Sequence, residues 1–434
     1  MERKLSIFTL GCRVNQFESL CMADDARAHG YTVVDWGEPA DIAIVNSCAL
    51  TLLAEAKTRQ DARIFARKNP DGVIAVTGCY AQTAANDIAK IDGVKWVIGN
   101  PAKLDIIDII ENNPPRATAQ IFLNAPAEAS KVLAKDGAIL ERTNLKIQDG
   151  CDNFCAYCII PRARGLPQSR DFADIVRDAK NLVSRGVREI ILTGINIAKF
   201  SSPKGSLIEL IDELNAIPNL LRLRLGSIEP PHFDMPALLE RMGDTSHILA
   251  PHFHISAQSL SDKVLAAMRR KYTALEFLNL IETARSRVPD ISIGADIICG
   301  HPGEDEKEFE ITLAAAAHSA LTSLHVFTFS PRPQTVAATM KDSTPPKPIR
   351  KARADQLRAI GAELENSFIK SQIGKTRPVL LENQLPNSDY LSYTDNYIQT
   401  LVNIPAKNLR NKLADVKIVD TQSNRAFAKL VRLH

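Results

Sequence analysis

The sequence predicts an α/β protein with three folded parts: an N-terminal parallel-sheet α/β domain over residues 1–115, a partial (β/α)6 barrel over 138–372, and a small C-terminal β-barrel over 373–434. Short β-type runs alternate with helical stretches through the first two parts, which is typical of parallel sheets covered by helices. Proline-rich segments at 112–115 and 343–348 interrupt this alternation. The Pro/Ala/Ser-rich stretch over 116–137 is predicted to be a linker.

The N-terminal domain is predicted from alternating strands and helices. Its strands are expected over 4–10, 41–45, 72–77 and 95–98, and its helices over 17–29, 53–68, from about 83, and over 101–111. The helix over 53–68 carries five Lys and Arg residues, as solvated helix faces often do. Contact with RNA phosphates is the alternative interpretation of this basic face.

The central part is predicted from six further β-type runs spaced roughly 30 to 45 residues apart, which leaves room for one helix and one loop in each interval. These runs are 144–148, 189–193, 221–225, 253–256, 292–298 and 323–329. In parallel barrels the chemistry takes place at the C-terminal ends of the strands.

The C-terminal part begins after a basic helix expected over 350–370. Short β-type runs such as 376–381 and 414–419 favour a five-stranded mini-barrel of about 60 residues. From residue 375 onward nine Lys and Arg stand against five Asp and Glu, whereas the rest of the chain sums to about −1. This excess indicates either a polyanion contact or merely a soluble surface.

Composition excludes several classes of protein. The chain is 45% hydrophobic and 24% charged, which is ordinary globular usage and rules out a disordered or fibrous chain. Charges interrupt every apolar run well short of the roughly 18 residues that a membrane span needs, so no membrane partner is expected. The N-terminus does not resemble a signal peptide, and we therefore expect a cytoplasmic protein. Eight cysteines in a reducing compartment need an explanation other than disulfides.

Three of these cysteines follow the first barrel strand directly, as Cys151-x3-Cys155-x2-Cys158. Three thiolates are one fewer than the four that usually ligate a cubane iron–sulfur cluster, so one iron would stay open to a substrate or cofactor. A zinc site with a distant fourth ligand is the alternative, but zinc ribbons favour two Cys-x2-Cys pairs.

A second set of cysteines lies at strand ends of the N-terminal domain. Cys12, Cys48 and Cys79 each follow the C-terminal end of a predicted strand, in TLGC, VNSC and VTGC. These ends share one edge of a parallel sheet, where ligands bind, so the three thiolates can converge on a second cluster with an open iron. Three unrelated half-buried cysteines are the alternative. Cys21 and Cys299 lack this placement, and we expect both to be packing residues.

The Cys-x3-Cys-x2-Cys motif, with an aromatic residue before its last cysteine, resembles the radical S-adenosylmethionine enzymes. The resemblance implies a 4Fe-4S cluster whose open iron chelates S-adenosylmethionine and cleaves it to a 5′-deoxyadenosyl radical. Two three-cysteine sets and a small basic β module together resemble the methylthiotransferase family, whose C-terminal module is the RNA-binding TRAM domain. This resemblance implies two 4Fe-4S clusters, a sulfur source and an electron donor such as a flavodoxin or ferredoxin.

The sequence around the cysteines resembles one branch of that family. TLGCRVNQFES, NPDGVIAVTGCYAQ and SPRPQTVAATM are similar to enzymes that convert N6-threonylcarbamoyladenosine at position 37, in the tRNA anticodon stem-loop, to its 2-methylthio derivative. The isopentenyladenosine branch typically has Gln-Met-Asn after the first cysteine and the ribosomal-protein aspartate branch Pro-Lys-Asn, whereas Arg13-Val14-Asn15 stands here. Those two branches are the alternatives. A non-catalytic iron–sulfur RNA-binding protein is the alternative from another class.

The same resemblance implies residues for S-adenosylmethionine. Glu229 and Gln258 are expected at its ribose or amino group, and Arg269 at its carboxylate or at the substrate. The remaining expected cofactor residues are Tyr157, beside the adenine, and Thr193 and Gly194, at the second strand end. The sequence departs from the family pattern at Ser256, Ala257, Leu260 and His301.

Further expectations concern neighbouring basic residues and histidines. Arg162 and Arg164 are expected near the substrate. His252 and His254 are expected as polar residues of the barrel interior rather than as metal ligands. A cobalamin-dependent radical methylase is disfavoured, because its usual Asp-x-His pattern is absent from the first 115 residues, whose single histidine is His29.

Overall fold

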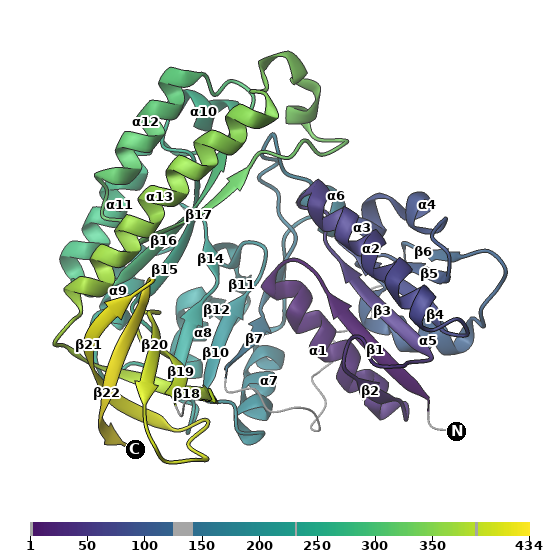
Figure 1. Cartoon of the computed structure of the whole chain (residues 1–434), viewed down its shortest axis with the longest axis horizontal. Coiled ribbons are helices and arrows are strands. Elements are labelled where there is room, and N and C mark those ends of the chain that lie inside the picture. Colours follow the sequence, from purple (N-terminus) through teal and green to yellow (C-terminus); the bar gives the residue numbers. More distant parts are fainter. Residues whose placement is uncertain (1–2, 125–141, 231, 387–388) are drawn as a thin grey trace.

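The computed structural model describes residues 3–124, 142–230, 232–386 and 389–434. Figure 1 shows the N-terminal α/β part, the larger central part, and the C-terminal β-barrel beneath one end of the central part. The expected start of the central part at residue 138, and most of the expected linker, lie outside the described residues. The predicted fold class is confirmed: parallel α/β sheets precede a closed five-stranded barrel.

The N-terminal sheet has six parallel strands in the order β2-β1-β3-β4-β5-β6. Every residue of the central strand β3 is buried, because helices cover both faces of the sheet. The edge strands β2 and β6 were not predicted, and β6 lies within the expected linker. The strands are β1 (Lys4–Thr9), β2 (Thr32–Val34), β3 (Ile42–Ser47), β4 (Val73–Gly78), β5 (Val94–Ile98) and β6 (Gln120–Phe122).

Two helices of this domain begin at or next to a cysteine, earlier than predicted. Helix α1 (Arg13–Ala28) follows Cys12 at once, and α3 (Cys79–Thr83) begins at Cys79 itself. Gly78 makes the turn into α3 at φ +96°, and a side chain there would overlap the backbone of Ser47. The remaining helices are α2 (Leu52–Lys68), α4 (Ala85–Ile88) and α5 (Ile106–Asn112).

The central part is an open parallel barrel built on the six predicted strands. Its third strand is interrupted at Gly226: the first half, β13, pairs with β10, and the second half, β14, pairs with β15. Among the described strands no pairing joins β17 to β7, so the barrel does not close. The strands are β7 (Arg142–Lys146), β10 (Glu189–Thr193), β13 (Arg222–Leu225), β14 (Ser227–Ile228), β15 (His252–Gln258), β16 (Ser292–Cys299) and β17 (Ser323–Thr328).

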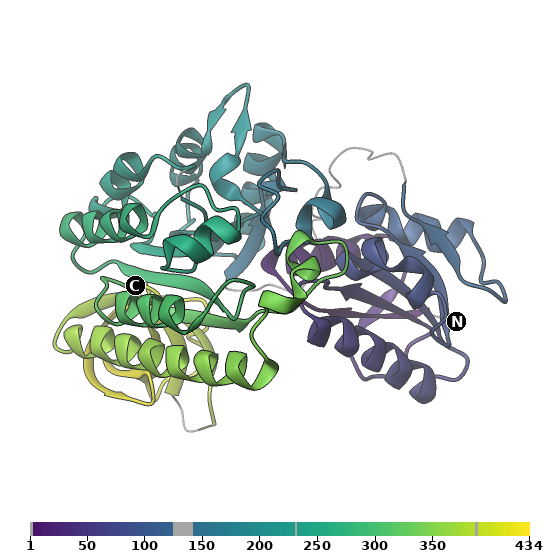
Figure 2. The ribbon, with the colours of Figure 1, turned by 90° about the horizontal axis from the view of Figure 1, so that it is seen from above.

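Helices cover the outside of this open barrel, and Figure 2 shows them in a row around it. The longest is α13 (Lys347–Ser371), which packs on β17 where Gly361 approaches Leu324 closely. The other helices are α6 (Ile160–Arg164), α7 (Phe172–Ser184), α8 (Leu207–Asn215), α9 (Met235–Gly243), α10 (Asp262–Ala267), α11 (Ala274–Arg287) and α12 (Glu306–Ala317). No helix in the described ranges is long and apolar enough to cross a membrane.

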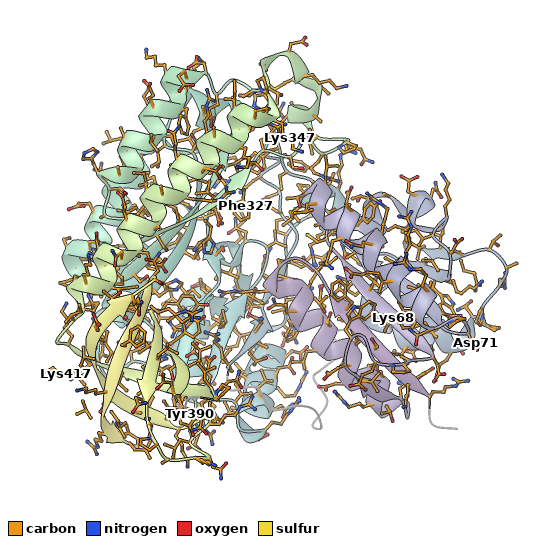
Figure 3. The ribbon with its side chains drawn as sticks, viewed as in Figure 1. Lys68, Asp71, Phe327, Lys347, Tyr390 and Lys417 are labelled. Carbon is orange, nitrogen blue, oxygen red and sulfur yellow. The ribbon has the colours of Figure 1, made fainter. Side chains whose placement is uncertain are left out.

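The C-terminal strands close into a barrel in the order β18-β19-β20-β22-β21, as predicted. Tyr390, labelled in Figure 3, is completely buried and packs with Val379, Leu381 and Val402. The strands are β18 (Thr376–Gln384), β19 (Asp389–Thr394), β20 (Gln399–Asn403), β21 (Leu413–Gln422) and β22 (Arg425–Leu433).

Buried arginines attach this barrel to the central part. Arg222 and Arg224, on β13, share the carboxylate of Glu189 on β10, with contacts of 3.0 and 2.6 Å. Their other N–H groups donate to backbone carbonyls of the C-terminal barrel, including Pro378 at 3.0 Å and Thr394 at 2.7 Å. The barrel is therefore docked through charge-assisted hydrogen bonds that are excluded from water.

A second buried ion network joins the N-terminal domain to the central part. Glu18 on α1 accepts from Lys103 at 2.6 Å, Lys146 at 2.8 Å and Arg164 at 3.0 Å. Arg164 also pairs with Asp149 at 2.8 Å, and its side chain has no exposed surface. These interactions hold the two sheets in a fixed relation around the space between them.

Candidate active site

One cavity of about 1150 Å³ is lined by side chains from all three parts of the chain. The N-terminal domain contributes Cys12 and Cys48, and the C-terminal barrel contributes Tyr393, Tyr397 and Arg425. The central part contributes the three cysteines of its motif, Cys151, Cys155 and Cys158. All three central cysteines and two of the three N-terminal ones therefore open on the same space, whereas Cys79 is buried and is not among the described residues that line it.

The three central cysteines lie on the loop that follows β8 (Gln148–Asp149). Gly150 turns this loop at φ +70°, where a side chain would overlap the backbone of Leu166. The backbone N–H of Asn153 donates to Cys151 Sγ at 3.5 Å, and Arg270 Nη1 donates to Cys155 Sγ at 3.5 Å. Hydrogen bonds of this kind tune the sulfur ligands of iron–sulfur clusters.

Burial affects the thiols of this motif. It raises the pKa of Cys151, and it raises the pKa of Cys158 to about 12. Metals bind cysteine as the thiolate, so a bound metal would replace the protons of these buried thiols. The three sulfur atoms on one loop, with N–H donors to two of them, fit the three-thiolate ligation of a cluster.

The N-terminal set lies at the edge where strands β1, β3 and β4 end. Gly11 packs so closely on Cys48 that an added Cβ would lie 2.8 Å from Cys48 Sγ. The amide of Asn100 donates to Cys79 Sγ at 3.6 Å, and the backbone N–H of Leu50 donates to Cys48 Sγ at 3.5 Å. These donors also fit a set of cluster thiolates.

Electrostatics couple the three N-terminal thiols to one another. Burial raises the pKa of Cys48 to about 11, and negative charge on Cys79 and Cys12 raises it further. Burial also raises the pKa of Cys12, while Arg164 opposes that rise. Cys21 and Cys299 are buried in the apolar core, as predicted for packing residues.

Glu229, just after β14, connects three elements at the mouth of the barrel. Its carboxylate accepts from the side chain of Asn153, from Asn196 Nδ2 at 2.8 Å, and from Arg270 Nη1 at 2.5 Å. The cluster loop, the end of β10 and the segment after α10 are thereby tied to one carboxylate. Its orientation is fixed before any ligand binds.

The arginine that lines the cavity is Arg270, whereas the predicted residue was its neighbour Arg269. Arg269 is exposed at φ +61° and is not among the described residues that line the cavity. Its neighbour Arg270 lines the cavity instead and donates to the Ser256 carbonyl at 2.7 Å. Arg269 ends the turn after α10 in a left-handed conformation that directs the chain onward, so that Arg270 meets Glu229.

The other predicted cofactor residues line the cavity. Thr193 and Gly194 stand at the end of β10, and Gly194 leaves no room for a side chain beside the Gln148 carbonyl. Gln258 ends β15 at a bulge, with φ +64°. Non-glycine residues seldom adopt such a backbone, and they do so most often at functional sites. Tyr157 lies between Cys155 and Cys158 and also lines the cavity.

His301 stands where the family pattern has an aromatic residue, and its ring also packs against aromatic rings. It is fully buried and meets the edges of Tyr157 and Phe329, with ring centroids 6.0 and 5.4 Å apart. Burial lowers the pKa of His301 to about 4, so the ring is neutral. Of the other departures, Ala257 and Leu260 are buried and Ser256 lines the cavity.

Several site residues were not found from the sequence. Arg332, only 4% exposed, pairs with Glu55 of α2 and lies in the electrostatic range of Cys48. Its Nε and Nη1 atoms have no hydrogen-bond partner within the described parts of the chain. The SPRPQ segment was the only signal for it. Arg164, expected near the substrate, is instead buried in the network between the domains.

Comparison with known proteins agrees with this geometry. The model of the "Radical SAM superfamily" matches residues 145–316, and that of "Uncharacterized protein family UPF0004" matches residues 4–99. A Bacillus subtilis protein, threonylcarbamoyladenosine tRNA methylthiotransferase MtaB, is 33% identical over 96% of this chain and 93% of its own. An Agrobacterium fabrum tRNA-2-methylthio-N(6)-dimethylallyladenosine synthase is 32% identical over 99% of this chain and 97% of its own.

Solved structures share the fold. The radical S-adenosylmethionine methyltransferase TsrM from Kitasatospora setae superposes with a TM-score of 0.57 over 75% of this chain and 73% of its own, at 14% identity. At that identity the likeness concerns the fold alone. The relatives above cover nearly the whole chain at more than 30% identity, and from them it follows that the chain belongs to the radical SAM tRNA methylthiotransferases.

Proposed function

We propose that the protein converts N6-threonylcarbamoyladenosine at position 37 of tRNA to its 2-methylthio derivative. The observation that carries the proposal is that Cys12 and Cys48 of the N-terminal set line the same cavity as the three central cysteines, since a sulfur donor and a radical generator must reach the same substrate carbon. Relatives from Bacillus subtilis, Aquifex aeolicus and Thermotoga maritima, 32–35% identical, carry the threonylcarbamoyladenosine name. Arg13-Val14-Asn15 also favours this branch.

The central cysteines hold the first cofactor. Membership of the radical SAM superfamily implies a 4Fe-4S cluster and S-adenosylmethionine, which together supply a 5′-deoxyadenosyl radical when bound. Cys151, Cys155 and Cys158 present three thiolates to this cluster. Glu229 offers a preoriented acceptor for the ribose or amino group of S-adenosylmethionine, and Arg270 holds Glu229 in place.

The N-terminal cysteines hold a second 4Fe-4S cluster in this proposal. Cys12, Cys48 and Cys79 would carry the sulfur that becomes methylated and inserted. Arg332 would face that sulfur with its two unpartnered N–H groups, because the side chain is buried beside Cys48. A sulfur source and an electron donor such as a flavodoxin or ferredoxin complete the reaction.

The substrate enters as the tRNA anticodon stem-loop. The C-terminal barrel, which we assign as a TRAM-like RNA-binding module, contributes Tyr393, Tyr397 and Arg425 to the cavity wall. Aromatic rings stack on unpaired bases, and arginine binds phosphate. The alternative substrate is isopentenyladenosine, since relatives from Bartonella henselae and Agrobacterium fabrum are named as dimethylallyladenosine synthases.

Nucleoside mass spectrometry of tRNA tests the proposal. Cells without the gene should lose 2-methylthio-N6-threonylcarbamoyladenosine, and the loss should be reversed by the parent and by Cys21→Ala, whose thiol lies in the core outside both sets. Cys151→Ala should not restore the nucleoside. If the missing nucleoside is the isopentenyl derivative, the substrate branch is wrong. Unchanged tRNA nucleosides would overturn the tRNA reaction itself. Loss of the methylthio group from a ribosomal-protein aspartate in the same cells would then identify the other branch.

A further inference from the structure

Three metal-ligating side chains converge in the cavity away from both cysteine sets. His254, Asp296 and His325 lie on the adjacent parallel strands β15, β16 and β17, and all three line the cavity. His254 Nε2 lies 2.8 Å from Asp296 Oδ1, and His325 Nδ1 lies 3.6 Å from the same oxygen. One ligand atom from each residue falls within 4.8 Å of the other two.

The sheet itself brings these side chains together. Asp296 is directly opposite His325 in the strand register, and His254 is opposite Gly294, two residues before Asp296. Gly294 makes the site possible, because an added Cβ would lie 2.8 Å from His254 Nδ1. Adjacent parallel strands of a barrel can project such residues into one layer, here within the strands rather than at their C-terminal ends.

The charges around the cluster favour a cation. Glu365, from α13, is electrostatically coupled to His325 and accepts from Asn424 at 2.9 Å. Asp296 and Glu365 place two carboxylates on this wall, and burial raises the pKa of Glu365. Two arginines also line the cavity: Arg358 of α13, which is paired with Asp355 at 2.8 Å, and Arg425, which follows Asn424. A divalent cation would balance the two carboxylates.

We propose that His254, Asp296 and His325 form a binding site for a divalent metal ion, with its open coordination positions toward the cavity. Ligands about 2.1 Å from one ion lie roughly 3.0 Å apart in octahedral and roughly 3.4 Å apart in tetrahedral geometry. The two nitrogen–oxygen separations, 2.8 and 3.6 Å, bracket these values. Two imidazoles and one carboxylate suit Mn²⁺, Fe²⁺ or Zn²⁺, and they leave positions for oxygen ligands.

Titration of the cluster-loaded protein with Mn²⁺ tests the site. Free Mn²⁺ has a six-line EPR spectrum that disappears on binding, so the signal reports the free ion. The oxidised clusters give no EPR signal and do not interfere. Mn²⁺ binds thiolates poorly, so the cysteines should not compete for it. We expect one strong site per chain. Asp296→Asn and His325→Ala should each weaken Mn²⁺ binding by at least about tenfold. Residues that only hydrogen-bond to a metal ligand already cost about 10- to 100-fold in metal affinity when they are replaced, and these two residues are proposed to be ligands themselves. His325 is 63% exposed, so its variant should fold normally.

The matched control is His318→Ala, an exposed histidine at the end of α12 that lies outside the cluster. It should bind Mn²⁺ like the parent, and Zn²⁺ should displace Mn²⁺ from both. The proposal is overturned if the parent shows no strong site, or if Asp296→Asn and His325→Ala bind as tightly as His318→Ala. In that case His254 and Asp296 form only a hydrogen-bonded pair. The assay does not depend on methylthio transfer, so its failure leaves the proposed function standing.

Discussion

Substitution Glu189→Gln should loosen the C-terminal barrel from the rest of the protein. Glu189 is 2% exposed, and its carboxylate is shared by Arg222 and Arg224. A glutamine has the same shape but removes the charge and turns an N–H group toward the N–H groups of one arginine. Both arginines also donate to the barrel carbonyls, so their displacement should reach the interface.

Two routes to the magnitude agree. Removing one partner of a buried ion pair typically costs about 3–5 kcal/mol. Burial alone would raise the pKa of Glu189, but Arg224 and Arg222 outweigh it and lower the pKa from 4.5 to about 2. That difference corresponds to roughly 3 kcal/mol. Because the folded pKa is lowered, this stability is present above about pH 4.5 and is lost as the pH falls toward 2.

Hydrogen exchange of the cluster-loaded protein measures the effect. If the barrel opens by undocking, about 3 kcal/mol corresponds to a roughly 100-fold faster exchange of protected amides in β18 to β20. Glu213→Gln is the matched control, since Glu213 is an exposed carboxylate on α8. Equal exchange in the two variants would refute the reasoning that Glu189 holds the docking arginines.

Three further predictions concern the cavity and the residues packed behind its wall. Arg270→Lys keeps the charge, but a lysine cannot contact both the Glu229 carboxylate and Cys155 Sγ. The affinity for S-adenosylmethionine, measured by equilibrium dialysis, should fall about tenfold while the iron content stays unchanged. An unchanged affinity would contradict this role. In the parent, the free energy of unfolding should fall by up to roughly 3 kcal/mol between pH 6.5 and about 4, because the buried neutral ring of His301 resists the protonation that the unfolded chain accepts. His301→Phe should remove this loss. Unfolding midpoints of the cluster-free variant and parent should therefore diverge across that range, and parallel curves would refute the prediction. Arg425→Gln should weaken tRNA binding and reduce the slope of log affinity against log salt concentration by about 0.7. Lys417→Gln should do neither, because Lys417 is exposed and lies outside the cavity lining. Equal effects of the two substitutions would show that the cavity does not contact the tRNA.

Regular features of the fold could be predicted from the sequence. Strands that are buried on both faces read as apolar runs, as β3 and β10 do, and all six barrel strands were found from β-type runs at regular spacing. Strands β2 and β6 have only three residues each and lie at the sheet edges, so their apolar signal is too short to distinguish from a loop. The place of Cys12, Cys48 and Cys79 at the ends of β1, β3 and β4 could also be predicted, because each follows an apolar run.

Features that depend on the tertiary structure could not be predicted. The sequence places Arg269 and Arg270 side by side, and only the left-handed turn after α10 decides which of them meets Glu229. Arg332 and Glu55 are 277 positions apart, and no periodic pattern links them. His325 carries no motif, and it joins His254 and Asp296 only through the strand register.

The central claim is that the two cysteine sets do separate halves of one reaction. The most direct measurement follows the products of a Cys12→Ala/Cys48→Ala/Cys79→Ala variant given S-adenosylmethionine, substrate tRNA and a strong reductant. The variant should bind about half of the roughly eight irons of the parent and should still release 5′-deoxyadenosine, because the barrel cysteines are intact. It should form no methylthio nucleoside, whereas the corresponding triple variant of the central motif should form neither product. Methylthiolated adenosine made by the N-terminal variant would contradict the division of labour.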